Sequence, residues 1–202
     1  MKVIGMCGGS GSGKGVVASF LRAEGIPVID TDKVYRDLTS HNTPCLSELV
    51  KRFGESIVSS NGSLDRQRLA SIVFLKTNAE ENREDLNRIA HKHILNQTRE
   101  IISQLANEGN YCVVVDAPLL FESGFAEECD IILAIIAPID VRVARIIARD
   151  RITQDLAVQR ISAQLPDSYI TERSDFVIVN DGNLEDLEIK IKDITKKIFE
   201  SK

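Results

Sequence analysis

A glycine-rich loop that ends in lysine lies near the start of the chain, and its residue types suit the binding of a row of phosphates. Residues 8–14 read Gly-Gly-Ser-Gly-Ser-Gly-Lys and follow an apolar run at 3–7. With so few side chains in the way, successive backbone N–H groups can point inward as an anion-binding nest. The next helix would present its positive end to the same anion. Lys14 adds a mobile charge that can follow a phosphoryl group during transfer.

The spacing from Gly8 to Lys14 fits the P-loop pattern G-x-x-x-x-G-K-[ST] except at its last position, which is Gly15. The hydroxyl that usually binds Mg²⁺ is therefore absent from that position. A flexible Gly/Ser linker is the alternative, but a linker does not follow a buried strand and open an amphipathic helix. The helical face after the loop is apolar and contains Val16, Val17, Phe20 and Leu21. This context favours nucleotide phosphate binding.

Carboxylates follow two of the predicted strands. Asp32 comes just after the strand at 26–29, where it could orient or deprotonate an attacking hydroxyl, and we favour this role over capping of the next helix. The role of Asp30, two positions earlier, is left undecided. Asp116 ends the apolar strand at 111–116. It could contact Mg²⁺, directly or through water, or it could cap the loop that follows.

Five arginines cluster in the two helices predicted after the fourth strand. They are Arg142, Arg145, Arg149, Arg151 and Arg160. Guanidinium groups bind phosphates bidentately and stabilise transferring charge. We interpret Arg145 and Arg149 as part of a phosphate-facing lid, whereas the other three suit a solvated surface equally well.

Two histidines lie two positions apart on a predicted helix, so they point to different sides and form a poor metal-binding pair. His91 is interpreted as a polar contact to a ligand, and His93 as a surface residue.

The elements that must position these residues alternate between strand and helix. Strands are predicted at 2–7, 26–29, 111–116, 131–136 and 176–179. Helices are predicted at 14–24, 33–40, 44–53, 64–76, 79–107, 139–150 and 153–164 and from 183 onward. This alternation indicates an α/β fold with a parallel sheet covered on both faces, whose ligands bind beyond the carboxyl ends of the strands. About 80 residues separate the second and third strands, far more than one crossover needs. We interpret them as a helical insert that holds a second substrate.

Composition excludes several other classes of protein. The 202 residues carry a net charge of −5, with 43% hydrophobic and 27% charged residues. A general nucleic-acid-binding or anionic membrane surface is therefore not expected, and no obligate protein partner is evident. No stretch approaches transmembrane length. Cys7, Cys45, Cys112 and Cys129 form no C-x-x-C pair and are interpreted as buried free thiols in a reducing, cytoplasmic compartment.

Taken together, these segments resemble the dephospho-CoA kinase family over nearly the whole chain. The marks of the resemblance are residues 4–14, 28–32, 64–66, 73–74, 91–94, 116–122, Arg145, 149–150, 160–164 and 178–182. The resemblance implies a three-layer P-loop fold similar to nucleoside monophosphate kinases, with a five-stranded parallel sheet, a helical substrate-binding insert and a helical lid. It implies transfer of the ATP γ-phosphate to the ribose 3′-hydroxyl of dephospho-CoA, which is the last step of CoA synthesis.

The resemblance also implies domain boundaries and site residues. Residues 1–31, 110–138 and 166–202 would form the nucleotide-binding core, 32–109 the CoA-binding insert and 139–165 the lid. The implied ATP-binding residues are Gly9, Gly11, Ser12, Gly13, Lys14, Gly15, Val16 and Asn180. The implied catalytic residues are Lys14, Asp32, Arg145 and Arg149. The implied acceptor-binding residues are Asp32, Arg66, His91 and Leu119, and Asp116 is the candidate metal contact.

The chain departs from the family pattern at two places. The usual His-Pro is His91-Lys92, which loosens the backbone there. Gly15 replaces the Ser or Thr after the lysine and is followed by Val16, which puts the mode of Mg²⁺ coordination in question. Another kinase of the same fold and a non-catalytic nucleotide-binding regulator remain alternatives. A GTPase switch is disfavoured because no Asn-Lys-x-Asp motif is present.

Overall fold

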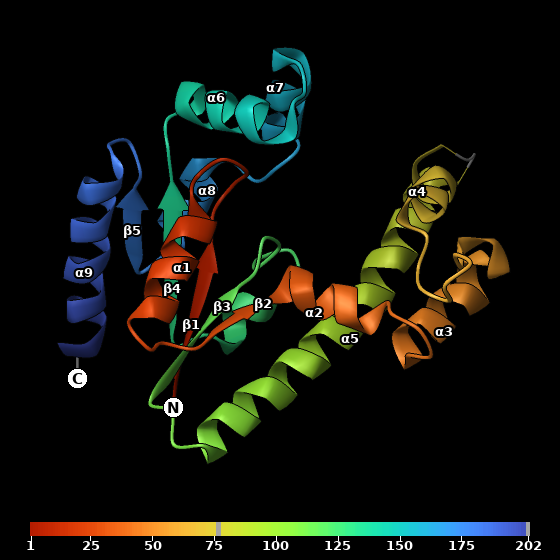
Figure 1. Ribbon diagram of the computed structural model, residues 1–202, viewed down its shortest axis with the longest axis horizontal. Coiled ribbons are helices and arrows are strands. Elements are labelled where there is room, and N and C mark those ends of the chain that lie inside the picture. The colour runs from red at the N-terminus through yellow and green to blue at the C-terminus, as the bar shows by residue number, and fades with distance from the viewer. Residues whose placement is uncertain (76–77, 201–202) are drawn as a thin grey trace. The chain divides into compact units, whose positions relative to one another are not determined.

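Five strands form one parallel sheet in the order β2-β3-β1-β4-β5 (Figure 1). The strands are β1 (Lys2–Cys7), β2 (Val28–Asp30), β3 (Cys112–Asp116), β4 (Ile131–Ile136) and β5 (Phe176–Val179). Their runs of Val and Ile suit a sheet that is buried on both faces. The predicted five-stranded parallel sheet is therefore confirmed. The second strand begins later than predicted because Pro27 has no N–H to donate, although its carbonyl accepts a 2.9 Å hydrogen bond from Val114 N.

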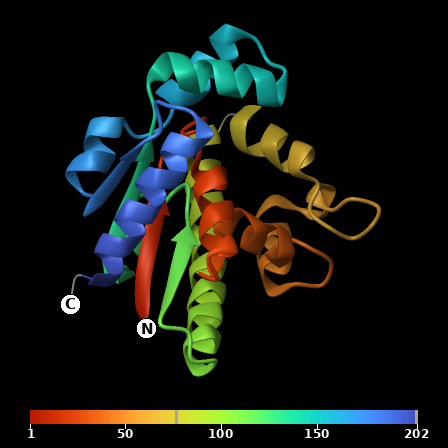
Figure 2. The ribbon, with the colours of Figure 1, turned by 60° about the vertical axis from the view of Figure 1, so that its left-hand side comes forward.

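The computed structural model describes residues 1–75 and 78–200, and the chain divides into two compact units. The first unit, Met1–Ile29 with Leu105–Lys202, contains the sheet. Its helices are α1 (Lys14–Ala23), α6 (Ile139–Asp150), α7 (Gln154–Ser162), α8 (Asp167–Glu172) and α9 (Leu184–Glu200), with a short 3₁₀ turn η2 (Phe125–Glu128). Figure 2 shows α1 and α9 side by side over the strands. Their apolar faces bury Val17, Leu21 and Ile191 against the sheet.

The second unit, Asp30–Gln104, is helical. It contains α2 (Thr31–Leu38), α3 (Pro44–Phe53), the 3₁₀ turn η1 (Glu55–Ile57), α4 (Arg66–Leu75) and most of α5 (Ala79–Asn107). A separate hydrophobic core holds these helices together, and it includes Leu49, Phe53, Ile57, Val73 and Ile89. Because this unit buries its own apolar side chains, it has the core that an inserted domain requires.

One helix was not predicted from the sequence. Helix α8 has only six residues, too few for a 3.6-residue hydrophobic pattern to be recognised. Pro166 precedes it, and Ile170 of the helix is buried. The other predicted helices lie within a few residues of the observed ones, and Lys76, the last residue of the helix predicted at 64–76, lies outside the described residues.

The cysteines are free thiols, and burial raises their pKa values. The pKa of Cys7 is raised to about 11 and that of Cys129 to about 12, in both cases chiefly by loss of solvation. The interpretation as buried thiols is confirmed for Cys7, Cys45 and Cys112, whereas Cys129 is only partly buried. In the part of the chain that the structure describes, no helix is long and apolar enough to cross a membrane.

Candidate active site

The loop between β1 and α1 adopts a backbone that glycine alone adopts easily. Gly8, Gly11 and Gly13 have φ angles of 147°, 79° and 98°. A Cβ atom at Gly8 would lie 2.1 Å from the carbonyl oxygen of Ile135 in β4. The glycines therefore allow the phosphate loop, residues 8–14, both to turn and to approach the sheet closely.

Asn180 supports the loop from the end of β5. Its side chain is almost fully buried, and its Nδ2 donates a 2.8 Å hydrogen bond to the carbonyl oxygen of Ser12. A Cβ atom at Gly13 would lie 2.1 Å from the same Nδ2. The predicted ATP-binding residue Asn180 thus contacts the loop itself.

Arg145 of α6 joins this contact. Its Nη1 donates to the carbonyl oxygen of Gly11 at 3.2 Å, and its Nη2 donates to Oδ1 of Asn180 at 3.2 Å. One guanidinium group therefore links the start of the predicted lid to the phosphate loop and to the end of β5.

Lys14, the first residue of α1, lies beside Asp116 at the carboxyl end of β3. Lys14 Nζ is 3.9 Å from Asp116 Oδ1, and their side chains are 15% and 17% exposed. Asp116 is opposite Met6 in the parallel register, directly before the loop that follows β1. The sheet thus brings a cation and an anion to the place where a P-loop phosphate and its metal would be bound.

Two predicted loop residues open α1. A Cβ atom built at Gly15 meets no heavy atom within 4 Å, so a side chain would fit there. The side chain of Val16 is exposed.

Sequence reasoning left Arg142 undecided, and it counted Gln164 only among the marks of the family resemblance, without a role. Both contact the phosphate loop: Arg142 Nε donates to the carbonyl oxygen of Ser10 at 2.9 Å, and Gln164 Oε1 accepts from the N–H of Ser10 at 2.8 Å. The three-residue spacing from Arg142 to Arg145 was the available signal, because it places both on one helical face. No local signal could reveal Gln164, which is 154 positions from Ser10.

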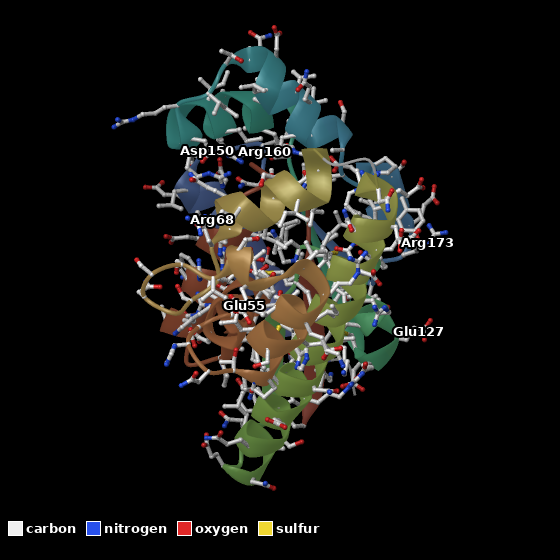
Figure 3. All side chains as sticks on the ribbon, turned by 90° about the vertical axis from the view of Figure 1, so that its right-hand side faces the viewer. Glu55, Arg68, Glu127, Asp150, Arg160 and Arg173 are labelled. Atoms are coloured by element: carbon white, nitrogen blue, oxygen red, sulfur yellow. The ribbon has the colours of Figure 1, made fainter. Side chains whose placement is uncertain are left out.

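Arg149 lies further along α6 in a group of charges shared with α7. Its Nε is 2.7 Å from Asp150 Oδ1, and Arg160 also pairs with Asp150. Asp150 and Arg160 lie next to each other in Figure 3. Hydrogen bonding from Arg149, followed by the charge of both arginines, lowers the pKa of Asp150 to about 2. Because this pKa lies below the ordinary carboxyl value, the pairs persist at neutral pH and are lost only as the pH falls through about 2.

In the second unit, Asp30 and Asp32 have different positions in α2. Asp30 is the N-cap residue and accepts a 2.9 Å hydrogen bond from the N–H of Lys33. Asp32 lies in the first helical turn and is exposed. Since Asp30 caps the helix, the alternative that Asp32 does so is wrong.

The histidine pair was only partly predicted. His93 is not a surface residue: its side chain is 16% exposed, and Nε2 lies 2.7 Å from Oε2 of Glu48 in α3. Lys92 Nζ is 3.0 Å from the same oxygen, and the two partners lower the pKa of Glu48. His91 is half-buried in α5. The position where the family usually has proline therefore carries a lysine that ties α5 to α3.

The remaining predicted substrate contacts belong to different units. Arg66 begins α4, and its guanidinium carbon lies 5.6 Å from the centre of the Tyr35 ring. Leu119 follows β3 in the first unit and is 47% exposed. Among residues 1–75 and 78–200, no group of three or more His, Cys, Asp or Glu side chains forms a ready-made metal site.

Comparison with known proteins extends over nearly the whole chain. The family model described as dephospho-CoA kinase matches residues 2–186. A dephospho-CoA kinase from Fusobacterium nucleatum is 37% identical over 190 residues, which cover 94% of this chain and 95% of the relative. Another from Corynebacterium glutamicum is 34% identical over 196 residues, with 97% and 96% covered. A solved structure from Thermus thermophilus is 32% identical, covers 97% of both chains and has a TM-score of 0.79.

Proposed function

This chain belongs to the dephospho-CoA kinase family, and from that membership we propose how its residues divide the work of phosphoryl transfer. The protein is a phosphotransferase that converts dephospho-CoA to CoA with ATP as donor, in the last step of CoA biosynthesis. The acceptor atom in this proposal is the oxygen of the ribose 3′-hydroxyl. The observation that carries the proposal is the supported phosphate loop, with Lys14 at its end beside Asp116.

The first unit binds ATP in this proposal. Backbone N–H groups of the loop and the N-terminus of α1 bind the phosphates. The residues whose backbone approaches the phosphates closely are Gly9, Gly11, Ser12, Gly13, Gly15 and Val16. Lys14 neutralises charge on the γ-phosphoryl group as it moves. Arg145 holds the loop and stabilises the transferring charge, and Arg149 joins it when the lid encloses ATP. The contacts of Arg145 to Gly11 and Asn180 support this assignment.

The acceptor-binding residues in this proposal are Asp32, Arg66, His91 and Leu119. Asp32 positions the 3′-hydroxyl and accepts its proton as the oxygen attacks the γ-phosphorus. Asp30 already caps α2, so the carboxylate of Asp32 is not needed as a helix cap, and this supports the proposed role. Arg66 and His91 bind polar groups of dephospho-CoA, and Leu119 adds an apolar contact to it. In domain terms, 32–109 is the substrate-binding insert, 139–165 is the lid, and the remaining residues are the core.

Mg²⁺ belongs to this proposal as the partner of ATP. When bound, it would neutralise charge on the phosphates of ATP during the transfer. The carboxylate chemistry of Asp116, at the carboxyl end of β3 and beside Lys14, fits a contact to a hydrated Mg²⁺ through water. No hydroxyl at position 15 competes with water for the metal, so we propose looser Mg²⁺ binding than in a P-loop that carries Ser or Thr.

We predict that Gly15→Ser lowers the Mg²⁺ concentration that gives half-maximal rate, because its hydroxyl would replace a water ligand. The structure leaves room for the new Cβ atom. Serine in a helical turn also removes a backbone entropy cost of about 0.5 kcal/mol, so stability must be measured separately. Mg²⁺ dependence of both turnover and ADP binding is the measurement.

Gly13→Ser provides the contrasting variant. Its side chain would collide with Asn180 on a backbone with φ of 98°, so this change should damage nucleotide binding at every Mg²⁺ concentration. A folded Gly15→Ser enzyme with an unchanged Mg²⁺ requirement would show that another ligand already fills the place of the hydroxyl.

The activity itself is tested by coupled detection of ADP. We expect ADP release to depend on dephospho-CoA and the product to be CoA, identified by mass. Adenosine and AMP are the comparison acceptors, since another nucleoside kinase of this fold would use them. Equal stimulation by AMP with none by dephospho-CoA would reject the assignment.

A further inference from the structure

Arg142 is a buried cation at the base of the predicted lid. Its side chain is 4% exposed, although Arg is almost never found so deeply buried unless it is paired. Nη1 lies 2.9 Å from Oδ1 of Asp167 in α8, which neutralises the charge. The ion pair joins α6, which follows β4, to α8, which precedes β5.

The same guanidinium group also contacts the phosphate loop. Nε donates to the carbonyl oxygen of Ser10 at 2.9 Å, and Nη2 donates to Oε1 of Gln164 at 3.2 Å. Gln164 Oε1 in turn accepts the N–H of Ser10 at 2.8 Å. Both backbone polar groups of one loop residue are therefore bound by Arg142 and Gln164. Figure 1 shows the loop between β1 and α1 reaching toward α6.

The residues on either side of Ser10, Gly9 and Gly11, have no side chain that would interfere with the contact between Arg142 and the loop. A Cβ atom at Gly9 would lie 2.1 Å from Nη2 of Arg142, and a Cβ atom at Gly11 would lie 2.7 Å from the backbone oxygen of Arg142. The guanidinium group thus occupies the space that a side chain at Gly9 would need. The loop packs directly on the backbone of α6 at Gly11.

We propose that Arg142 is a positioning residue that, with Gln164 and Asp167, holds the phosphate loop in the form that binds the phosphates of ATP. The proposal rests on the kinase function given above. In this proposal the guanidinium group of Arg142 does not contact the reacting atoms. It acts by fixing the Ser10 backbone before ATP arrives, so that less loop ordering has to accompany binding.

The fork shape of arginine is central to the proposal. Three acceptors, from Ser10, Gln164 and Asp167, surround one planar group. Lysine keeps the charge but donates from a single nitrogen on a flexible stem, so it cannot reproduce this geometry. Arg142→Lys therefore removes the clamp while it leaves a cation for Asp167.

We expect Arg142→Lys to raise the Kd for ADP and the KM for ATP by about tenfold, as for loss of a charge-assisted hydrogen bond to the loop. kcat at saturating ATP should fall less than about threefold, and the KM for dephospho-CoA should not change, because the effect is confined to loop ordering. Gln164→Leu removes the acceptor for the Ser10 N–H without burying a new charge. It should likewise raise the Kd for ADP and the KM for ATP, with little change in kcat and none in the KM for dephospho-CoA. ADP binding is measured by calorimetry, and unfolding is measured on each variant.

Arg173→Lys is the matched control, since Arg173 lies exposed at the end of α8 with its guanidinium over the Tyr169 ring. It should bind ADP like the parent enzyme. If Arg142→Lys and Gln164→Leu both bind ADP like the parent, the positioning role is wrong, whatever happens to their stability. A loss of stability with equal effects on ATP and dephospho-CoA would also overturn it. The ADP titration needs no acceptor, so a failure of the proposed kinase function would appear separately, as absence of CoA formation by the parent enzyme.

Discussion

Asp32→Asn should retain ATP binding and lose roughly a hundredfold or more in turnover, which is the usual cost of removing a positioned general base. The amide keeps the size of the carboxylate but cannot accept the proton of the 3′-hydroxyl. Because the change lies in the first turn of α2, on an exposed side chain, little loss of stability is expected. Steady-state kcat with dephospho-CoA, together with a calorimetric Kd for ATP, is the measurement.

Asp30→Asn is a closely matched control two positions earlier. Asparagine caps helices about as well as aspartate, so its Oδ1 can still accept from the N–H of Lys33. The two variants make the same chemical change in the same segment, and only Asp32→Asn should lose turnover. Near-normal turnover of Asp32→Asn would remove Asp32 from the reaction.

Lys14→Ala should lower turnover by about 10²–10³-fold, the range found when one group that stabilises transition-state charge is removed. It should also weaken ATP binding, because the ammonium group neutralises phosphate in the ground state. Lys14 lies 3.9 Å from Asp116, so its removal also leaves that carboxylate without this cation. Turnover, ATP affinity and thermal unfolding are therefore measured on the same preparation.

Lys192→Ala serves as the control for Lys14→Ala. Lys192 is an exposed lysine on α9, with its Nζ 6.0 Å from the centre of the Phe20 ring, and it belongs to no proposed site. Its loss should leave turnover unchanged. If Lys14→Ala binds ATP and turns over like the parent enzyme, the assignment of residues 8–14 as a phosphate loop is wrong.

The sequence determined those features that depend on neighbours along the chain. The glycines, their spacing to Lys14 and the apolar run before them are sufficient for a strand, a loop and a helix N-terminus. Alternating strands and helices indicated the parallel sheet, because each period of hydrophobicity is local. The same reasoning predicted that Arg145 faces a phosphate, which stays a prediction; the structure shows its guanidinium group donating to the carbonyl oxygen of Gly11 in the loop.

Tertiary structure alone decided how that loop is held. Arg142 and Gln164 contact Ser10 across 132 and 154 positions of sequence, and a hydrogen bond between such distant residues leaves no periodic pattern. The choice between a surface arginine and a buried one depended on Asp167, which lies in the short helix α8 that the sequence did not reveal.

The contacts of Asp30 and His93 could not be predicted from the sequence either. Either aspartate could cap α2 by residue type, and only the observed hydrogen bond to Lys33 identifies Asp30 as the cap. His93 was predicted at the surface because it and His91, two positions apart, point to different sides of the helix, yet Glu48 of another helix pairs with it. The order of helices along the chain does not tell which helices pack together. Helices pack together because their apolar side chains are buried, and the polar contacts between them form only where that packing brings them close.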